Sequence, residues 1–432
     1  MTRITLNPVA LAARIQSLDI LRGFAALGIL LMNIPVMGLS WNWEHPPLPV
    51  RWDADWIAFV VQQVTFNGVM RGLFTLLFGA GMIVMLTRPD PAREDAAQQA
   101  YFSRCFALML LGFVNFAILL WPGEILFSYG LCGMVLFLFR KADLRLVALA
   151  AAVTLILMPI GLHHALAGST ELLQRADAAV AARDAGKTPT KEEAAALKTR
   201  DDKIRESQSP QARAKERAIR TNWKTLPEWS LQKWSEISLT GPLTFWIQLE
   251  TLGSMLLGML LFRMGVLTGQ RTRRVYALMA VGGLIPGLAM RSAMVAALCR
   301  NAYVPTADVV TLELWLYQPA RLCMMIGMMG LVMLLLKSGA LGRLATPLAA
   351  VGRTALTTYI GQSVITSFLF YGLGLYGRFG FAQLMGLCLL IWILQCMMSM
   401  AWLRRFDMGP AEWLLRSLTY GRFTPIGRRT AS

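Results

Sequence analysis

Ten apolar runs, each about as long as a helix that crosses a membrane, constrain this chain more than any other feature. A bilayer core of roughly 30 Å requires about 20 apolar residues per helix. Of the 432 residues, 56% are hydrophobic and only 16% are charged, an apolar excess beyond that of a soluble domain. The sequence therefore predicts an all-α, polytopic transmembrane helix bundle. The runs lie near residues 18–39, 66–87, 104–121, 124–140, 145–168, 242–262, 275–298, 311–336, 348–370 and 379–403, with a further apolar stretch at 56–64.

One polar segment divides the chain. Residues 169–240 hold 14 of the 42 basic side chains and 11 of the 25 acidic ones. We predict a helical, extracytoplasmic insert there, between two membrane halves of five spans each, 1–168 and 241–404. Residues 405–432 are predicted to form a cytoplasmic tail. The insert has two open interpretations, a surface cap or linker and a lid over an extracytoplasmic substrate.

Two patterns give the insert local structure. Thr190 and Glu193 have the spacing of a capping box, which predicts the start of a helix. Trp223, Trp229 and Trp234 alternate with charges just before an apolar run, which is typical of an anchor at the depth of the lipid headgroups. We therefore expect these tryptophans to lie at the membrane interface.

The distribution of basic residues predicts the orientation. With the N-terminus inside, the cytoplasmic side collects 21 lysines and arginines, whereas the short outer loops hold three, Arg51, Arg300 and Arg378. Both termini are thus predicted in the cytoplasm. The net charge of +17 then faces anionic membrane lipids, which excludes nucleic acid as a partner. The six cysteines lie singly, without metal spacing, and no metal is expected.

The first apolar run carries three side chains that hydrocarbon rejects. At 100° per residue, Arg22 lies near 300° and Asn33 near 320° from Asp19, so the three residues share one helix face. We expect this face to point into the bundle. Asp19 and Arg22, three residues apart, are placed to pair near the cytoplasmic end.

Other polar residues fall at the depth of Asn33 once the direction of each span is fixed. Each would cost roughly 2.5–3.5 kcal/mol at a helix centre facing lipid. We therefore predict a shared hydrated cavity that opens outward, with Gln318 and Arg321 extending it inward and His45 near its mouth. The residues at this depth are Asn33, Asn67, Arg71, Asn115, Glu124, Glu250, Arg291 and Gln362.

Five stretches in order resemble one family. They are RIQSLDILRGFAALGILLMNI from residue 14, RGLFTLLFGAGM at 71–82, LLWPGEILFSYGLCG at 119–133, GRTALTTYIGQSVITSFLFYGLGLYG at 352–377 and GPAEWLLRSLTYG at 409–421. Together they resemble the YeiB-like family of bacterial inner-membrane proteins. The resemblance covers both ends and most of the membrane part. Only the insert at residues 169–240 is not covered by the resemblance.

The N-terminal motif is also similar to that of the transmembrane acyltransferase superfamily, which includes heparan-alpha-glucosaminide N-acetyltransferase. That resemblance implies transfer of an acyl group from cytoplasmic acyl-coenzyme A to an acceptor on the far side. The LRG…N motif matches Leu21, Arg22, Gly23 and Asn33, a catalytic loop histidine matches His45 in spacing only, and the late Y-x-G-H motif resembles Tyr359 to Gln362. Asn115 stands where YeiB-like proteins commonly have histidine, and Glu124 where they have aspartate.

These observations lead to an acyltransferase hypothesis. Asp19, Arg22 and Arg353, with Arg14, would bind the acyl-coenzyme A, and His45 or Glu124 would deprotonate the acceptor. Asn33 and Asn115 would donate hydrogen bonds to the reacting groups. Assembly into a homo-oligomer is left open. The predicted acceptor is a small molecule or a glycan of the cell envelope. The residues predicted to bind it are Asn67, Arg71, Glu250, Arg291, Tyr359 and Gln362.

Two alternatives remain at this point. The first is a transporter that binds a charged solute through Arg71, Glu124, Glu250 and Arg291. The second is a scaffold without catalytic activity, in which the polar groups only hold helices together.

Overall fold

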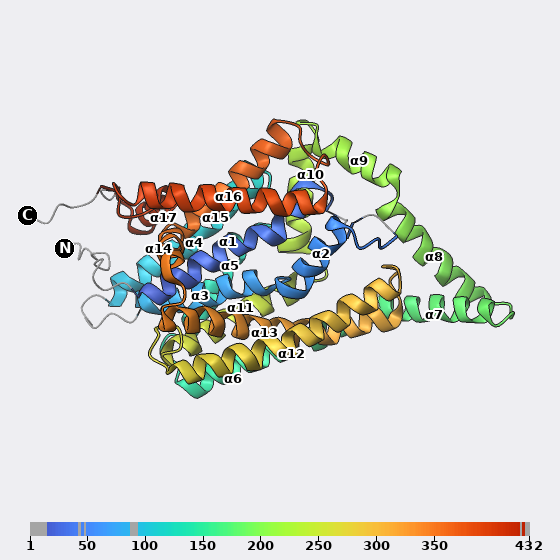
Figure 1. The fold of residues 1–432 in the computed structure, drawn as a ribbon, viewed down its shortest axis with the longest axis horizontal. Helices are drawn as coiled ribbons and strands as arrows, with labels where there is room; N and C mark the ends of the chain where they lie inside the picture. The colour runs from blue at the N-terminus through green and yellow to red at the C-terminus, as the bar shows by residue number, and fades with distance from the viewer. Residues whose placement is uncertain (1–14, 42–44, 47–48, 87–93, 424–425, 428–432) are drawn as a thin grey trace, which may run out of the picture.

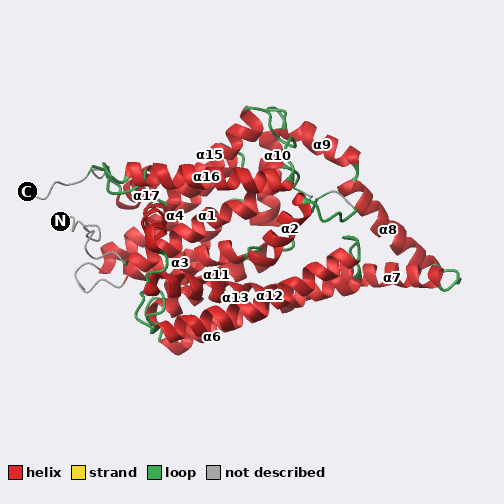
Figure 2. Cartoon of the chain, in the orientation of Figure 1, coloured by secondary structure: helices red, strands yellow, loops and turns green. Residues whose placement is uncertain are grey.

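The chain forms an elongated bundle of helices with a projecting arm. A computed structural model describes residues 15–41, 45–46, 49–86, 94–423 and 426–427. Within these ranges every named element is a helix (Figure 2). Most helices run along the long axis, both termini lie at one end, and the arm projects from the other (Figure 1). This arrangement confirms the predicted all-α bundle.

Eight helical stretches of the described chain are long and apolar enough to cross a membrane, which confirms a multi-pass membrane protein. One stretch combines α2 (Ala54–Thr65) and α3 (Val69–Leu86), so the apolar residues 56–64 belong to a span. The other stretches are α1 (Gln16–Gly38), α4 (Glu94–Ala117), α6 (Leu144–Ala165), α11 (Thr244–Arg263), α12 (Arg273–Arg300), α13 (Ala307–Ser338) and α16 (Phe381–Trp402).

Two of the ten predicted runs form shorter elements. Residues 124–140 give α5 (Leu126–Leu136) and one 3₁₀ turn, and 11 residues of α-helix span only about half of a bilayer core. Residues 348–370 give α14 (Ala345–Arg353) and α15 (Ala355–Ser367), which break at Thr354, and then the π-helical turn Phe368–Gly372. Hydropathy alone does not register such breaks.

Two arginines satisfy the backbone where α2 and α3 separate. A break inside a membrane leaves carbonyl groups that lipid cannot satisfy. Arg291 donates to the carbonyl oxygen of Asn67 at 2.9 Å, and Arg321 donates to that of Gly68 at 3.1 Å. Gly68 has a φ of +70°, and a Cβ there would lie 2.6 Å from the Tyr317 hydroxyl. Glycine is therefore required at this turn.

Glycines allow α1 and α14 to cross at backbone contact. A Cβ on Gly23 would lie 2.0 Å from the carbonyl oxygen of Leu348, and one on Gly352 would lie 1.7 Å from that of Asp19. Such close approach of small residues is a common way to pack helices in membranes. The crossing places the start of α1 beside the end of α14.

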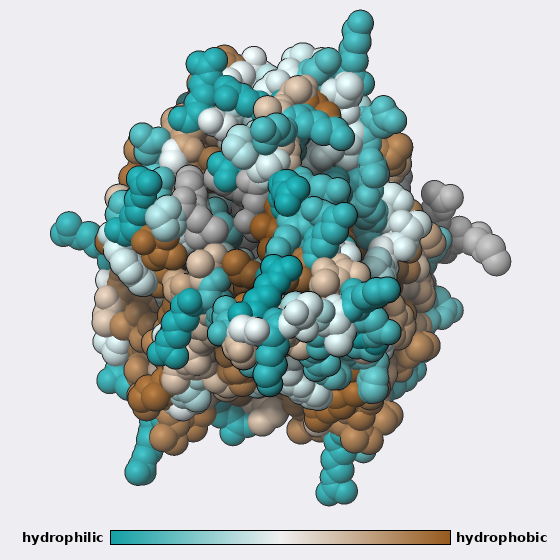
Figure 3. Space-filling view, turned by 90° about the vertical axis from the view of Figure 1, so that its right-hand side faces the viewer, coloured by the Kyte–Doolittle hydropathy of each residue, from teal (hydrophilic) through white to brown (hydrophobic). Residues whose placement is uncertain are grey.

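The insert forms an arm and a return segment. Helices α7 (Ala167–Asp184) and α8 (Lys191–Gln208) project as a hairpin, and α9 (Pro210–Arg220) and α10 (Leu226–Ser235) lead back to the bundle (Figure 1). The predicted capping box starts α8, with Glu193 N–H donating to Thr190 Oγ1 at 3.3 Å and Thr190 N–H donating to the Glu193 carboxylate at 2.8 Å. Seen end-on from the arm, hydrophilic residues run across this face, and hydrophobic residues gather mainly along the sides (Figure 3).

The expected interfacial anchor is wrong for two of its three tryptophans. Trp223 is exposed, but Trp229 and Trp234 are buried. Trp234 stacks on Phe116 of α4 with 4.0 Å between ring centroids, so α10 packs on protein and not on lipid headgroups. The sequence shows the aromatic residues but not their packing partners.

Arg220 of α9 joins the insert to the end of α1. Its side chain is fully buried. It donates to the carbonyl oxygens of Val36 and Met37 at 3.0 and 3.2 Å and to the hydroxyls of Tyr371 and Tyr376 at 2.5 and 3.1 Å. The last carbonyls of a helix have no partner within it, so this guanidinium acts as a cap for α1.

Candidate functional site

The bundle encloses a polar cavity of about 520 Å³ on the side of the arm, which we call the polar chamber. Five of the predicted residues line it, together with Gln62, Gln63, Ser128 and Glu313. The depth argument therefore placed residues from α1, α3 and α12 in one cavity correctly. The five residues are Asn33, Asn67, Arg71, Glu124 and Arg291.

A charged network forms part of the chamber wall. Glu250 accepts hydrogen bonds from Arg71 at 2.9 Å and lies 2.8 Å from a guanidinium nitrogen of Arg321. The side chains of Glu250 and Arg321 are 3% and 1% exposed, whereas that of Arg71 is 37% exposed and lines the chamber. Glu250 thus holds Arg71 in place. It stabilises two positive charges in the interior.

An amide relay lines the chamber on α2. Asn67 Nδ2 donates to the Gln63 side chain at 2.5 Å, Gln63 donates to Gln62 at 3.2 Å, and Gln62 donates to the Leu31 carbonyl at 2.6 Å. The Leu31 carbonyl needs this donor because residue 35, four positions later, is a proline without an N–H. The relay fixes three amide side chains in the lining of the chamber.

Glu124 lies at the start of α5 with both carboxylate oxygens engaged. One oxygen accepts from the backbone N–H groups of Leu126 and Phe127 at 2.7 and 3.1 Å, and the other accepts from Trp234 Nε1 at 3.0 Å. These bonds cap the helix and fix α10 on the bundle. Glu124 nevertheless lines the polar chamber.

Besides His45, six residues predicted for this cavity do not line the chamber, and two of them, Gln362 and Asn115, make no side-chain hydrogen bond to a lining residue. The other four are Glu250, Gln318, Arg321 and Tyr359. Gln362 is buried between α1, α15 and α16, where it donates to the Ala26 carbonyl at 3.0 Å and to Gln395 at 3.3 Å. Asn115 is 1% exposed, and neither polar atom of its side chain has a hydrogen-bond partner in the described chain. Depth along a helix does not give the direction in which a side chain points, and this accounts for both differences.

His45 lies behind the chamber wall. Its ring packs on Tyr303, with 4.5 Å between centroids, and on Trp56 at 5.9 Å, and Nδ1 is 2.8 Å from the Pro46 carbonyl oxygen. Tyr303 lines the polar chamber and separates His45 from it. His45 therefore contacts a residue of the chamber lining but does not line the chamber itself.

We expect His45 to make stability depend on pH. Burial lowers the pKa of its imidazole below the usual 6.5. The folded protein then keeps His45 neutral where the unfolded chain binds a proton, so this stability is present above about pH 6.5 and is lost as the pH falls below it. The melting temperature should drop between about pH 7.5 and about pH 5.5, and His45→Phe should reduce that drop. Equal drops in the two proteins would contradict this expectation.

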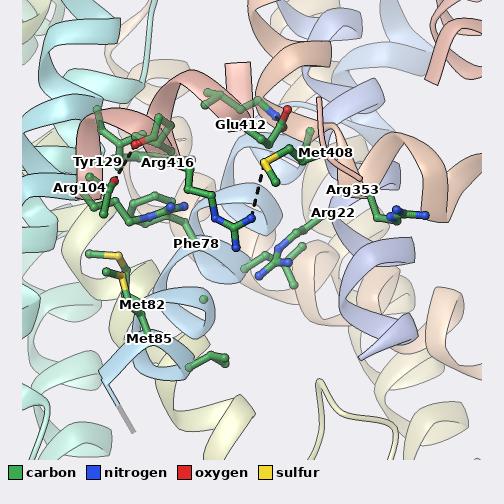
Figure 4. A pocket seen from close by; sticks show the side chains of 18 of the residues that line it. Arg22, Phe78, Met82, Met85, Arg104, Tyr129, Arg353, Met408, Glu412 and Arg416 are labelled. Carbon is green, nitrogen blue, oxygen red and sulfur yellow. Dashed lines mark hydrogen bonds between the residues drawn. The ribbon is translucent and has the colours of Figure 1, made fainter. Parts of the chain in front are cut away.

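A second cavity of about 360 Å³, which we call the arginine chamber, lies nearer the end with the chain termini. Four arginines line it, facing two carboxylates, so the lining has an excess of two positive charges (four minus two). In Figure 4, Arg416 reaches between Arg104 on one side and Arg22 and Arg353 on the other. The two carboxylates are those of Asp19 and Glu412. Guanidinium groups in such numbers suit phosphate oxygens.

Three of the four predicted donor-binding residues line this chamber. Arg22 and Asp19 form the expected pair at 3.5 Å, and Arg353 donates to the Asp407 carbonyl at 3.2 Å. Arg14 lies outside the described residues. The structure therefore brings Asp19, Arg22 and Arg353 together, although they come from distant parts of the chain.

Helix α17 (Pro410–Tyr420) closes one side of the arginine chamber. Its Glu412 accepts from the N–H groups of Leu356 and Thr357 at 2.6 and 3.2 Å and from the Thr357 hydroxyl at 2.5 Å. The carboxylate thereby caps α15 at its break from α14. Burial raises the pKa of Glu412, and these hydrogen bonds oppose the shift.

Sequence reasoning missed several lining residues. Arg104 and Arg416 count in the sequence only among the 21 basic residues that indicate the orientation, although Arg104 begins an apolar run. Tyr129 and Thr75 sit inside motifs that match the family, but neither is charged. Other missed residues include Trp41, Gln62, Gln63, Trp121, Ser128, Glu313 and Glu412.

The fold and its two cavities define a multi-pass helical membrane protein. The family model described as "Protein of unknown function (DUF418)" matches residues 261–422. The "Uncharacterized protein YeiB" of Escherichia coli (strain K12) is 30% identical, over 96% of this chain and 98% of its own length. The "Uncharacterized protein YxaH" of Bacillus subtilis (strain 168) is 28% identical over 99% of each chain. The chain belongs to the YeiB-like family. No solved structure matches it.

Proposed function

We propose that this protein is a membrane acyltransferase that moves an acyl group from acyl-coenzyme A to an acceptor on the other side of the membrane. One observation carries the proposal: an arginine-lined cavity and a polar cavity lie toward opposite ends of one bundle and share the lining residue Tyr129. We place the protein in a bacterial inner membrane with both termini in the cytoplasm, in agreement with the distribution of basic residues.

The arginine chamber is the proposed donor site. Its excess positive charge suits the phosphate groups of coenzyme A, which are available only in the cytoplasm. Arg22 and Arg353 are the cytoplasmic arginines predicted to bind the donor, and Arg104 and Arg416 add two further guanidinium groups.

The polar chamber is the proposed acceptor site. Asn33 and the amides of α2 would bind the hydroxyl groups of a glycan or another small envelope molecule, and Arg71 would orient them. The acceptor oxygen attacks the thioester carbonyl carbon, the new C–O bond forms and the C–S bond breaks. Glu124 takes the acceptor proton and passes it to the departing thiolate, which leaves coenzyme A as a thiol.

Acyl-coenzyme A should stabilise the purified protein. At about one hundred times the dissociation constant, linkage predicts a gain of about 2.7 kcal/mol in the free energy of unfolding. We expect Arg104→Gln or Arg416→Gln to raise that constant at least about tenfold, because each removes a charge-assisted hydrogen bond. Thermal melting with acetyl-, propionyl- and longer acyl-coenzyme A measures this, and Arg343→Gln, at an exposed position outside the lining, is the control. Absence of stabilisation by every acyl-coenzyme A would overturn the proposal.

The assignment of the base has its own test. Glu124→Gln should abolish transfer of radiolabelled acetyl groups to cell-envelope material while leaving donor binding unchanged. His45→Phe should keep the transfer, because His45 lies behind Tyr303. The opposite pattern would show that His45 is the base.

Transport of a charged solute is a second candidate function. It is favoured because the two cavities follow one another along the bundle and share the lining residue Tyr129. A carrier would expose one site to each side in turn. It would gain no stability from acyl-coenzyme A, so the melting experiment separates the two functions.

A further inference from the structure

The two chambers come closest at Tyr129 of α5, whose side chain lines both of them. On α3, Phe74 lines the arginine chamber, and the next residue, Thr75, lines the polar chamber. At the start of α5, likewise, Leu126 lines the arginine chamber and the preceding residue, Ile125, lines the polar chamber. At this point the cavities are separated by a layer one residue thick.

This layer is held by few interactions. The Tyr129 hydroxyl lies 2.6 Å from Thr75 Oγ1, and its ring packs on Phe78 and Phe74 with centroid distances of 4.9 and 6.1 Å. Displacing the ring breaks one hydrogen bond and two aromatic contacts and uncovers a buried side chain, so the displaced state is a minor one.

The ring also has space to move into. Cavities of about 360 and 520 Å³ lie on its two sides, so a displaced ring has a cavity to enter on either side. The neighbouring aromatic residues Phe74 and Tyr359 are held more firmly than Tyr129. Phe74 stacks on both Tyr129 and Tyr359, and the Tyr359 hydroxyl accepts a hydrogen bond from the backbone N–H of Ile125 at 3.1 Å. Tyr129 is the side chain at this boundary that faces a cavity in each direction.

We infer that the Tyr129 side chain is a door between the chambers, and that its displacement joins them into one continuous site for a single elongated ligand. The arginines hold the anionic head of that ligand, and a slim uncharged arm passes the aromatic rings, since a charged group would lose its hydration there. Only the identity of the ligand as acyl-coenzyme A rests on the proposed function.

Thiol labelling from one side tests the door without any ligand. Ser128→Cys places a reporter in the polar chamber, in a chain whose six native cysteines are replaced by serine. Sealed vesicles, sorted by protease access to a C-terminal tag, receive a methanethiosulfonate whose reactive group is joined to an anionic head by a slim uncharged alkyl chain and which cannot cross the membrane. Added at the side of the termini, it should label Tyr129→Ala at least about tenfold faster than the parent, and Tyr129→Phe by a smaller factor, since that variant loses only the Thr75 hydrogen bond.

Tyr101→Ala is the matched control, because Tyr101 is a fully buried tyrosine outside both linings. Equal labelling of parent and Tyr129→Ala, or equal acceleration by Tyr101→Ala, would overturn the door. If Tyr129→Ala does not fold, Tyr129→Phe is used for the test. A labelling rate of Tyr129→Phe equal to that of the parent would then overturn the proposal that Tyr129 is a door.

A second measurement tests the ligand. Acetyl-coenzyme A should slow labelling of Ser128→Cys from the side of the arm, and adenosine 3′,5′-bisphosphate, which has the anionic head but no arm, should not. Equal protection by both compounds would overturn the single spanning site. Protection by neither compound would overturn the proposed donor and the spanning ligand, while accelerated labelling of Tyr129→Ala would still support the door.

Discussion

Replacing Glu250 with glutamine is expected to lower the free energy of unfolding by about 3–5 kcal/mol, the usual cost of removing one partner from a buried ion pair. Glu250 lies 2.9 Å from Arg71 and 2.8 Å from Arg321, and Arg321 is 1% exposed. A glutamine leaves two guanidinium groups facing each other in the interior. Thermal melting or denaturant unfolding of the detergent-solubilised protein measures the loss.

Two further variants make this prediction specific. Glu228→Gln changes an exposed carboxylate on α10 and should leave the stability within about 0.5 kcal/mol of the parent. Glu250→Gln combined with Arg321→Met should lose less than the sum of the two single changes, because the residues interact. A loss below about 1 kcal/mol for Glu250→Gln would show that the network contributes little to the fold.

Gly352→Ala is expected to be the second most damaging single change. Its Cβ would lie 1.7 Å from the Asp19 carbonyl oxygen, which belongs to backbone and cannot rotate away. Helices α1 and α14 must then separate, at or above the upper end of the roughly 1–3 kcal/mol typical of overpacking. Both helices line the arginine chamber, so the separation should also weaken binding of any anionic ligand there.

Gly386→Ala is the matched control for that change. Gly386 lies inside α16, and its Cβ would meet no atom of the described chain within 4 Å. Alanine in a helix interior is more favourable than glycine by about 0.5–1 kcal/mol, so this variant should melt at the parent temperature or above it. A Gly352→Ala protein as stable as the parent would contradict the close crossing.

The polar chamber could be predicted because charges in apolar helices are costly. Asn33, Arg71 and Arg291 had to avoid lipid, and the direction of each span fixed their depth, so a common cavity followed. Gln362 and Asn115 satisfied the same argument but point elsewhere. Rotation about the helix axis depends on packing against neighbours, which hydropathy does not report.

The arginine chamber could be predicted only in part. Arg22, Arg353 and Arg416 lie in stretches that resemble the family, but only Arg22 and Arg353 are predicted to bind the donor. Arg104 resembles an ordinary basic residue at the start of an apolar run. The shared role of Arg104 and Arg416 depends on the fold of α17 against α4 and on the cap that Glu412 supplies to α15. That cap joins residues 55 and 56 positions apart, and no local pattern announces it.

The bond between Arg220 and the end of α1 sets an order on the making of this protein. The carbonyls of Val36 and Met37 receive their donors from a residue 184 and 183 positions later. A growing chain emerges from its N-terminus, so the first helix enters the membrane with its far end unfinished. It reaches its final form only after five more helices and the arm have been synthesised and α9 has folded back, and nascent chains cut short before Arg220 should be substrates for quality-control proteases.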